Sequence, residues 1–196
     1  MILTRFLRHF LVFVALVLPL TVVGWIILYP VLLCLPREAN NLPRFLRWFD
    51  NVDNDGLIGD RANQERNYKL GIDPFGDFAK YKWIAFRNPV QGFKYLFLGI
   101  NILDIGYIVA ENKPDIGGEI VGDYTSGGTL FATTFNGARK YYEYYLIKPH
   151  RIFNKNLCIR ARFGWKLAGL GDKPRTHVSW TFAFNPVHTY RGKYVD

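Results

Sequence analysis

The sequence predicts an α+β protein in which an apolar N-terminal helix and a short amphipathic helix precede an antiparallel β-rich domain. Residues 10–35 form a run of 26 residues without a charged side chain. Residues 42–49 carry apolar side chains at helical spacing, and residues 159–165 alternate apolar with basic side chains, as a half-buried strand does. The predicted parts are residues 1–37, an apolar membrane-type helix, residues 38–80, an amphipathic helix with an Asp/Asn/Gly loop, and residues 81–196, an aromatic, basic β-rich domain.

The apolar run is long enough to cross a bilayer. As a helix, 26 residues extend about 39 Å, more than the roughly 30 Å of bilayer hydrocarbon. A secretory signal peptide has a shorter apolar region, of about 7–15 residues, and a small-residue cleavage site, which is missing here. The residues before Cys34 are too bulky for a lipoprotein site. We therefore expect the segment to be retained in the mature protein.

Two prolines interrupt this run. Pro19 and Pro30 each lack a backbone donor and press against the preceding turn, so the helix is expected to kink or break at them. A re-entrant hairpin is the alternative to a single span. Basic residues flank both ends and bias the C-terminal body only slightly toward the cytoplasmic side.

The segment after the run is predicted to be an interfacial helix. Asn41 is a suitable N-cap, and Pro43 suits the first turn. An apolar stripe beside Trp and Arg, next to a membrane span, is typical of a helix in the headgroup layer. The alternative is that the stripe packs on the protein's own core. The predicted membrane-interface residues are Arg44, Phe45, Arg47, Trp48 and Phe49.

Residues 50–60, DNVDNDGLIGD, resemble the first half of a calcium-binding loop. Asn51, Asp53 and Asp55 fit positions 1, 3 and 5 of an EF-hand, and Gly56 fits the turn. Position 12, which needs a bidentate glutamate, is Ala62. These three residues are the candidate Ca²⁺ ligands, but a tight turn capped by its own side chains is the simpler interpretation. No other cofactor is predicted.

The rest of the chain is predicted to be β-rich, with five to seven strands in an antiparallel sheet or a partly open barrel. Residues 61–80 are expected to form a loop with at most a short helix, and the aromatic, β-branched segment that follows belongs to the β-rich body, broken at Asn88–Pro89. Gly127–Gly128 and Asn136–Gly137 are predicted turns, the second of them in a hairpin between 134–135 and 140–146.

Charge is unevenly distributed along the chain, which carries +9 overall. Residues 1–49 have a net charge of +4, residues 50–137 of −4 and residues 138–196 of +9. The basic ends suggest lipid headgroups or nucleic acid as partners, and the alternative is a solvated basic face. The residues predicted to contact nucleic acid or another anion are Arg160, Arg162 and Lys166, with tyrosines at 141, 142, 144 and 145 for stacking.

No catalytic pattern is found, so we predict that the protein is not an enzyme and has no small-molecule substrate. The four histidines lack metal-ligand spacing, and Ser126 lacks the nucleophile-elbow pattern. A site assembled in space from Asp104, Glu119 or Asp123 is the remaining alternative. The two cysteines are too few for a disulfide framework.

Three segments resemble motifs of an uncharacterised family of small proteins encoded by tailed bacteriophages and prophages. They are LPRFLRWFDNVDNDGLIGD at 42–60, KWIAFRNPVQGF at 82–93 and FGWKL at 163–167. The resemblance implies a phage context but no activity. The matching residues are Trp48, Asp53, Asn54, Gly59, Asp60, Arg87, Asn88, Pro89, Gly92, Phe93, Gly164, Trp165 and Lys166.

These observations favour a structural or ejection-associated virion protein whose apolar helix packs against copies of itself or inserts into the host envelope. Its expected partners are other virion proteins, copies of itself, the lipid bilayer and DNA. The alternative is a non-virion protein anchored in the host inner membrane, with a basic β-domain that binds nucleic acid or another protein. The expected location is the virion, the host inner membrane or both.

Overall fold

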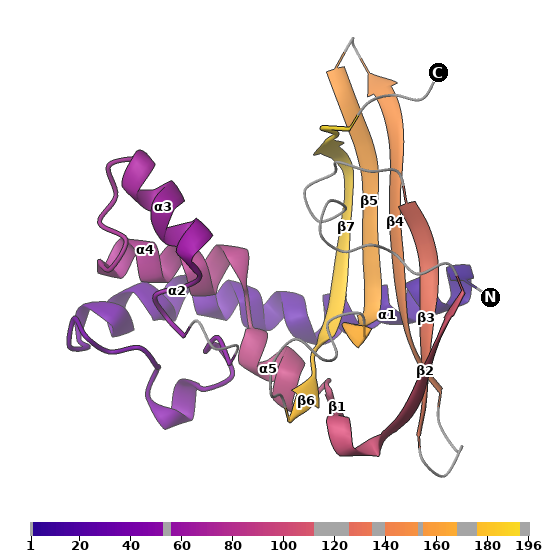
Figure 1. Ribbon diagram of the computed structural model, residues 1–196. Coiled ribbons are helices and arrows are strands. Elements are labelled where there is room, and N and C mark those ends of the chain that lie inside the picture. The colour runs from indigo at the N-terminus through magenta and orange to yellow at the C-terminus, as the bar shows by residue number, and fades with distance from the viewer. Residues whose placement is uncertain are drawn as a thin grey trace. The chain divides into compact units, whose positions relative to one another are not determined.

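The computed structural model describes residues 2–52, 56–111, 126–134, 140–152, 155–167 and 176–192 (Figure 1). The chain divides into two compact units, Met1–Phe10 with Gly99–Asp196, and Leu11–Leu98. The first unit contains the antiparallel sheets, and the second is helical. The predicted α+β class is therefore confirmed.

One continuous helix begins the chain. It runs from Ile2 to Leu33 as α1 (Ile2–Val12), a π-helical turn (Phe13–Val17) and α2 (Leu18–Leu33). The wider turn, closed by the Leu18 N–H donating to the Phe13 carbonyl, precedes Pro19. Because a proline ring presses on the carbonyl four residues earlier, a local change of pitch relieves it without ending the helix. The helix is distorted before Pro19 but does not break at Pro19 or Pro30, so the alternative of a re-entrant hairpin is wrong.

The helical unit continues with short elements. They are a 3₁₀ turn η2 (Arg44–Leu46), α3 (Arg61–Lys69), α4 (Asp77–Tyr81), a π-helical turn η3 (Lys82–Arg87) and α5 (Gln91–Leu96). Residues 61–80 contain the short helix α3, a connecting segment and the start of α4, so the predicted loop with at most a short helix is confirmed in part. The β-type interpretation of 82–96 is wrong. Trp83, Ile84 and Ala85 are all buried, so this run is apolar because it lies within a helical core.

The core of the helical unit packs against one side of α2. Leu28 and Leu32 of α2 are completely buried, and a Cβ on Gly24 would lie 3.0 Å from the ring of Phe49, so the ring packs directly on the helix. The remaining buried members of this core are Leu42, Leu46, Phe49, Leu57, Trp83, Ile84, Ala85 and Val90. Residues 42–49 are thus held to the helix by hydrophobic contacts.

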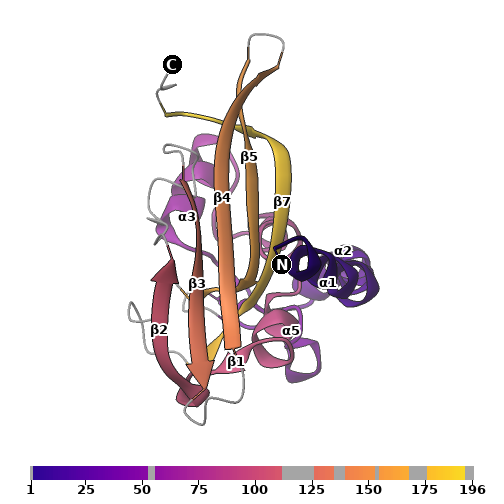
Figure 2. The same cartoon turned by 90° about the vertical axis from the view of Figure 1, so that its right-hand side faces the viewer.

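The other unit contains a five-stranded antiparallel sheet in the order β2-β3-β4-β5-β7 and a two-stranded sheet of β1 with β6 (Figure 2). The strands are β1 (Ile100–Asn101), β2 (Ile105–Glu111), β3 (Ser126–Thr134), β4 (Lys140–Ile152), β5 (Lys155–Trp165), β6 (His177–Val178) and β7 (Trp180–Thr189), with a 3₁₀ turn η4 (Ile102–Asp104) between β1 and β2. The described strands match the predicted antiparallel sheet.

The strand pairing tests the two predicted turns. Thr133 pairs with Lys140, so β3 and β4 form the predicted hairpin, although residues 135–139 lie outside the described residues. Gly127 and Gly128 are strand residues that pair with Leu146 and Tyr145. The prediction of a turn at Gly127–Gly128 is therefore wrong.

The first turns of α1 pack on an aromatic side of the five-stranded sheet. The ring of Phe6 lies 5.4 Å from that of Phe182 and 5.6 Å from that of Phe163. His9 is buried, stacks on Trp180 and has its Nδ1 3.1 Å from the Tyr142 hydroxyl. His9 therefore serves as a core residue of this unit.

Candidate functional site

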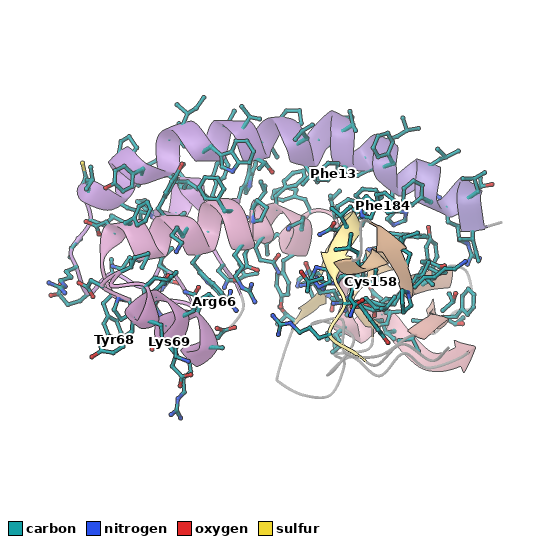
Figure 3. All side chains as sticks on the ribbon, turned by 90° about the horizontal axis from the view of Figure 1, so that it is seen from above. Phe13, Arg66, Tyr68, Lys69, Cys158 and Phe184 are labelled. Atoms are coloured by element: carbon teal, nitrogen blue, oxygen red, sulfur yellow. The ribbon has the colours of Figure 1, made fainter. Side chains whose placement is uncertain are left out.

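The outer side of the N-terminal helix exposes a row of large apolar side chains in the described helical unit (Figure 3). Its residues follow one another at intervals of three or four, which places them along one side of a helix. We call this set the exposed apolar side: Leu11, Val14, Leu18, Val22, Ile26, Tyr29 and Leu33. Soluble monomers rarely expose so long a continuous apolar surface, which usually marks an interaction site.

The helix is also apolar on the side that it buries. It is long and apolar enough to cross a bilayer. Hydrogen bonds nonetheless join α2 and the residues after it to the rest of the unit: the Trp25 indole donates to the Ala85 carbonyl at 2.9 Å, and the Lys80 ammonium donates to the Arg37 carbonyl at 2.6 Å. The helix is therefore one component of a folded unit that carries charged residues.

The predicted membrane-interface residues differ in exposure. Only Arg44–Leu46 is helical, as a 3₁₀ turn, so the predicted amphipathic α-helix is wrong. Phe45 is 82% exposed, and Arg44, Arg47 and Trp48 are exposed as well. Phe49 is buried against Gly24, because Leu42, Leu46 and Phe49 join the core instead of a membrane surface. Phe49 is therefore a core residue, and its assignment to the membrane interface is wrong.

The candidate calcium loop lies mostly beyond what the structure describes. Asp53 and Asp55 are outside the described residues, and Asn51 is buried. Within the described part of the chain, no three His, Cys, Asp or Glu residues are grouped as metal ligands would be. Asp60, at the end of this segment, caps α3 by accepting a hydrogen bond from the Asn63 N–H at 2.7 Å. The end of the segment therefore starts a helix.

Asp50, next to this loop, gives the unit a pH dependence. Burial raises its pKa to about 6, although the Leu42 and Asn51 N–H groups donate to its carboxylate and partly oppose the shift. The folded state therefore holds the proton at pH values where the unfolded chain has released it. The contribution of the Asp50 carboxyl to stability is greatest below about pH 4 and falls by on the order of 2 kcal/mol as the pH rises through 6.

Replacing Asp50 by Asn should remove this slope. Urea unfolding of the full chain in non-ionic detergent, from pH 4 to 8, is expected to show the fall in wild type and a flatter profile in Asp50→Asn. The variant should carry a constant loss of about 1 kcal/mol, because one amide oxygen cannot replace both carboxylate oxygens as acceptors. Equal slopes in the two proteins would contradict the assignment.

The predicted anion-contact residues are engaged within the sheet. Arg162 lies opposite Tyr145, and its guanidinium contacts the buried carboxylate of Glu143 through Nε at 2.6 Å and Nη2 at 2.5 Å. Arg160 donates to the Tyr145 hydroxyl at 3.3 Å. Tyr142 and Tyr145 are buried and cannot stack on bases. Among the predicted anion-contact residues, Arg162 is therefore corrected to a structural residue, and Lys166 is half-buried.

Several motif residues have structural roles. A side chain on Gly59 would meet the Trp83 ring at 2.8 Å, and the Trp83 indole donates to the Gly56 carbonyl at 3.1 Å. Gly92 lies against the Arg47 carbonyl, next to the hydrogen bond from the Phe93 N–H to the Trp48 carbonyl. The first two motifs thus pack on each other. Sequence reasoning missed these contacts, and it also missed which side of the N-terminal helix stays exposed, because both sides are apolar.

Comparison with known proteins identifies the family but no activity. No curated protein and no solved structure is significantly similar to this chain. A sequence profile described as "Family of unknown function (DUF7338)" matches residues 1–192, which is almost the entire length. The chain therefore belongs to the family of unknown function DUF7338.

Proposed function

We propose that this protein is a non-catalytic, phage-encoded protein that attaches to the host membrane through the exposed apolar side of its N-terminal helix. The observation that carries the proposal is the division of one helix into two apolar sides. One side completes the core of the helical unit, and the other is largely exposed, although Tyr29 contacts the ring of Tyr81 at 5.3 Å. Moving seven large, partly exposed side chains into hydrocarbon favours attachment by on the order of 7 kcal/mol.

The packing favours a helix that lies along the bilayer surface instead of crossing it. A spanning orientation would carry toward the hydrocarbon the segments that pack on α2, which include Lys82 and Arg87. A charged residue at the bilayer centre costs about 2.5 kcal/mol or more. Lying in the plane instead leaves the exposed apolar side in lipid and the charged segments in water.

The phage context rests on the resemblance of the three motifs. We propose that the protein is carried in the virion and meets the host envelope during ejection, where the exposed apolar side inserts. Before that, the same surface can be covered by copies of this chain or by neighbouring virion proteins. A non-virion protein made during infection and held at the inner membrane is the alternative.

Vesicle flotation tests the membrane-binding surface. Wild-type protein, diluted from detergent, is expected to float with neutral phosphatidylcholine vesicles. The double substitution Val22→Lys with Ile26→Lys should weaken binding about 100-fold, because each lysine resists transfer into the apolar layer. Leu70→Lys is the matched control, since Leu70 is an exposed apolar residue outside this surface. Equal flotation of the double variant, or no flotation of wild type, would refute the proposal.

The location needs a separate experiment. Mass spectrometry of purified virions should detect several copies per particle if the protein is delivered by the virion. Its absence from virions, together with recovery in host membranes, would support the alternative. Deleting residues 1–36 is a poor substitute for point substitutions, because Leu28 and Leu32 belong to the core.

A further inference from the structure

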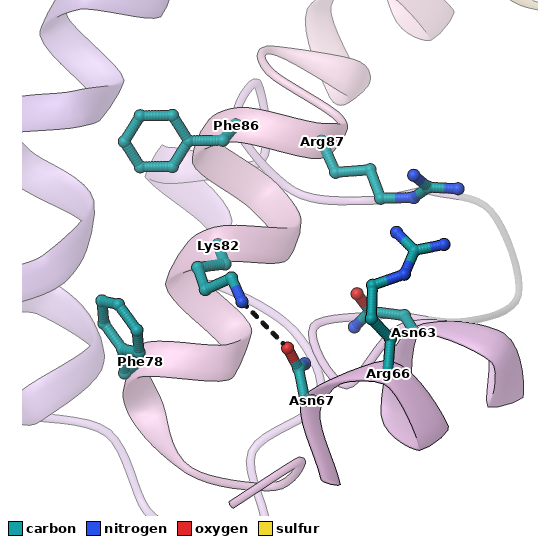
Figure 4. Close-up of a pocket in the computed structure, with 7 residues that line it drawn as sticks. All are labelled: Asn63, Arg66, Asn67, Phe78, Lys82, Phe86 and Arg87. Carbon is teal, nitrogen blue, oxygen red and sulfur yellow. Dashed lines mark hydrogen bonds between the residues drawn. The ribbon is translucent and has the colours of Figure 1, made fainter. Parts of the chain in front are cut away.

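A basic pocket lies between α3 and the helical segment formed by α4 and η3 (Figure 4). Its volume is about 680 Å³, within the range of about 300–1,000 Å³ typical of small-molecule sites. None of the predicted site residues belongs to it. The residues that line it are Asn63, Arg66, Asn67, Phe78, Lys82, Phe86 and Arg87.

Local sequence spacing brings these side chains together. Asp60 fixes the start of α3, so Asn63, Arg66 and Asn67 fall three and four residues apart on one side of that helix. On the opposing segment, the Asn88 N–H donates to the Trp83 carbonyl five residues earlier. Such a widened turn brings residues five apart toward the same side, which adds Arg87 to the side that Lys82 already occupies.

Two buried amides in this pocket have unused donors. Asn67 is 0% exposed and Asn63 is 7% exposed, and the Nδ2 atom of each has no hydrogen-bond partner among the described residues. The orientation of the Asn67 amide is fixed, because the Lys82 ammonium donates to its Oδ1 at 3.1 Å and an ammonium can only donate. Leaving a buried donor unmet costs about 1–3 kcal/mol, so both side chains are held in place at a cost in stability.

The charged residues among the described lining of the pocket are all basic. Arg66, Lys82 and Arg87 line it, and no carboxylate does so among the described residues. Figure 4 shows the guanidinium ends of Arg66 and Arg87 directed toward the same region. Like charges placed together are unfavourable unless an anion lies between them.

We infer that this pocket binds the phosphate group of an organic phosphate ester. Two guanidiniums and one ammonium supply the charge-assisted donors that a phosphate dianion accepts. Phe78 and Phe86 supply an apolar wall for the organic part of the ester. The volume exceeds what a bare phosphate fills. Phosphate binding at this site does not depend on membrane attachment.

Calorimetric titration of the full chain in non-ionic detergent, with phenyl phosphate and then inorganic phosphate, tests the pocket. Saturable binding of both at millimolar or lower concentration is expected, with phenyl phosphate the tighter ligand. The double variant Arg66→Gln with Arg87→Gln should bind about tenfold more weakly for each guanidinium lost, or worse. Both arginines are exposed, so the variant should fold. Lys69→Gln, on the same helix but outside the pocket lining, is the control and should bind as wild type does (Figure 3).

A second variant distinguishes an effect of charge on phosphate binding from an effect of lost folding. Asn67→Asp keeps the shape of the side chain and strengthens the contact with Lys82, yet it places a negative charge in the pocket. Loss of phosphate binding with unchanged or raised thermal stability supports the inference. Undiminished binding in either pocket variant, or no saturable binding in wild type, overturns it.

Vesicles distinguish the two sources of such a phosphate group. If the ester is a lipid headgroup, phosphatidylglycerol vesicles should bind wild type more tightly than neutral vesicles, and the Arg66→Gln/Arg87→Gln variant should lose that preference but still float. If it is a soluble compound, phenyl phosphate should bind while the two vesicle types bind alike. Failure of flotation with phosphate binding intact would contradict the membrane proposal alone.

Discussion

Replacing Gly164 by alanine is expected to destabilise the sheet unit by about 4 kcal/mol. Gly164 has a φ of +113°, a conformation that side chains rarely adopt, and an added Cβ would collide with the Tyr142 carbonyl oxygen and lie 3.2 Å from the Glu143 Cα. Because these atoms are backbone of the paired strand β4, they cannot move aside without breaking the β4–β5 pairing. Urea unfolding of the full chain in detergent, followed by tryptophan fluorescence, measures the loss.

Gly71→Ala is the matched control for this prediction. Gly71 has a φ of +70°, but a Cβ there would meet nothing within 4 Å, so the substitution costs only the backbone strain, about 1 kcal/mol. The difference between the two variants therefore isolates the close approach of β4 and β5. Equal losses would show that the pairing relaxes, and the assignment of Gly164 as a packing residue would fail.

The sheet could be predicted from the sequence because its signals are local. Alternation over residues 159–165 fits β5, in which Ala161 and Phe163 are buried, and the Asn136–Gly137 dipeptide marks the β3–β4 hairpin. The role of Gly164, in contrast, could not be predicted from local sequence patterns. Its role depends on the backbone of a strand some twenty residues away, which no local pattern contains.

The helical segment after residue 76 could not be recognised in the same way. A short run such as Trp83–Ala85 that is apolar on every side suits a buried strand and a buried helix equally. Tertiary contacts distinguish the strand from the helix: the run packs on Leu28 and Leu32 of α2, so it forms a helix within a helical core. The basic pocket was missed for a related reason, since Arg66 and Arg87 meet only once both helices are in place.

The sequence also could not show which residues form the exposed apolar side. The composition of residues 10–35 predicts contact with hydrocarbon or protein, but it does not say which residues make each contact. Gly24 and Leu28 face the core, whereas Val22 and Ile26 do not, and this division follows from where Phe49 packs. The membrane prediction thus changes from a span toward a surface helix once the tertiary contacts are known.

The second large effect is expected at Glu143, whose carboxylate is buried beside Arg162. The Glu143 side chain is 1% exposed and the Arg162 side chain 12%, so removing one partner leaves the other charge buried without a counter-ion. Glu143→Met should therefore cost about 3–5 kcal/mol. The loss should be insensitive to salt, because a buried pair is screened little. Urea unfolding at low and high sodium chloride measures both.

A double-mutant cycle decides whether the loss comes from the stranded charge. If it does, adding Arg162→Met to Glu143→Met should recover most of the stability, since the paired positions then bury apolar side chains of similar volume beside Tyr145. Arg61→Met in the same Glu143→Met background is the control, because the Arg61–Glu65 pair is exposed and should contribute less than about 1 kcal/mol. If Arg162→Met alone leaves stability unchanged, Arg162 is not tied to Glu143, and its charge would again be free to contact an anion such as nucleic acid.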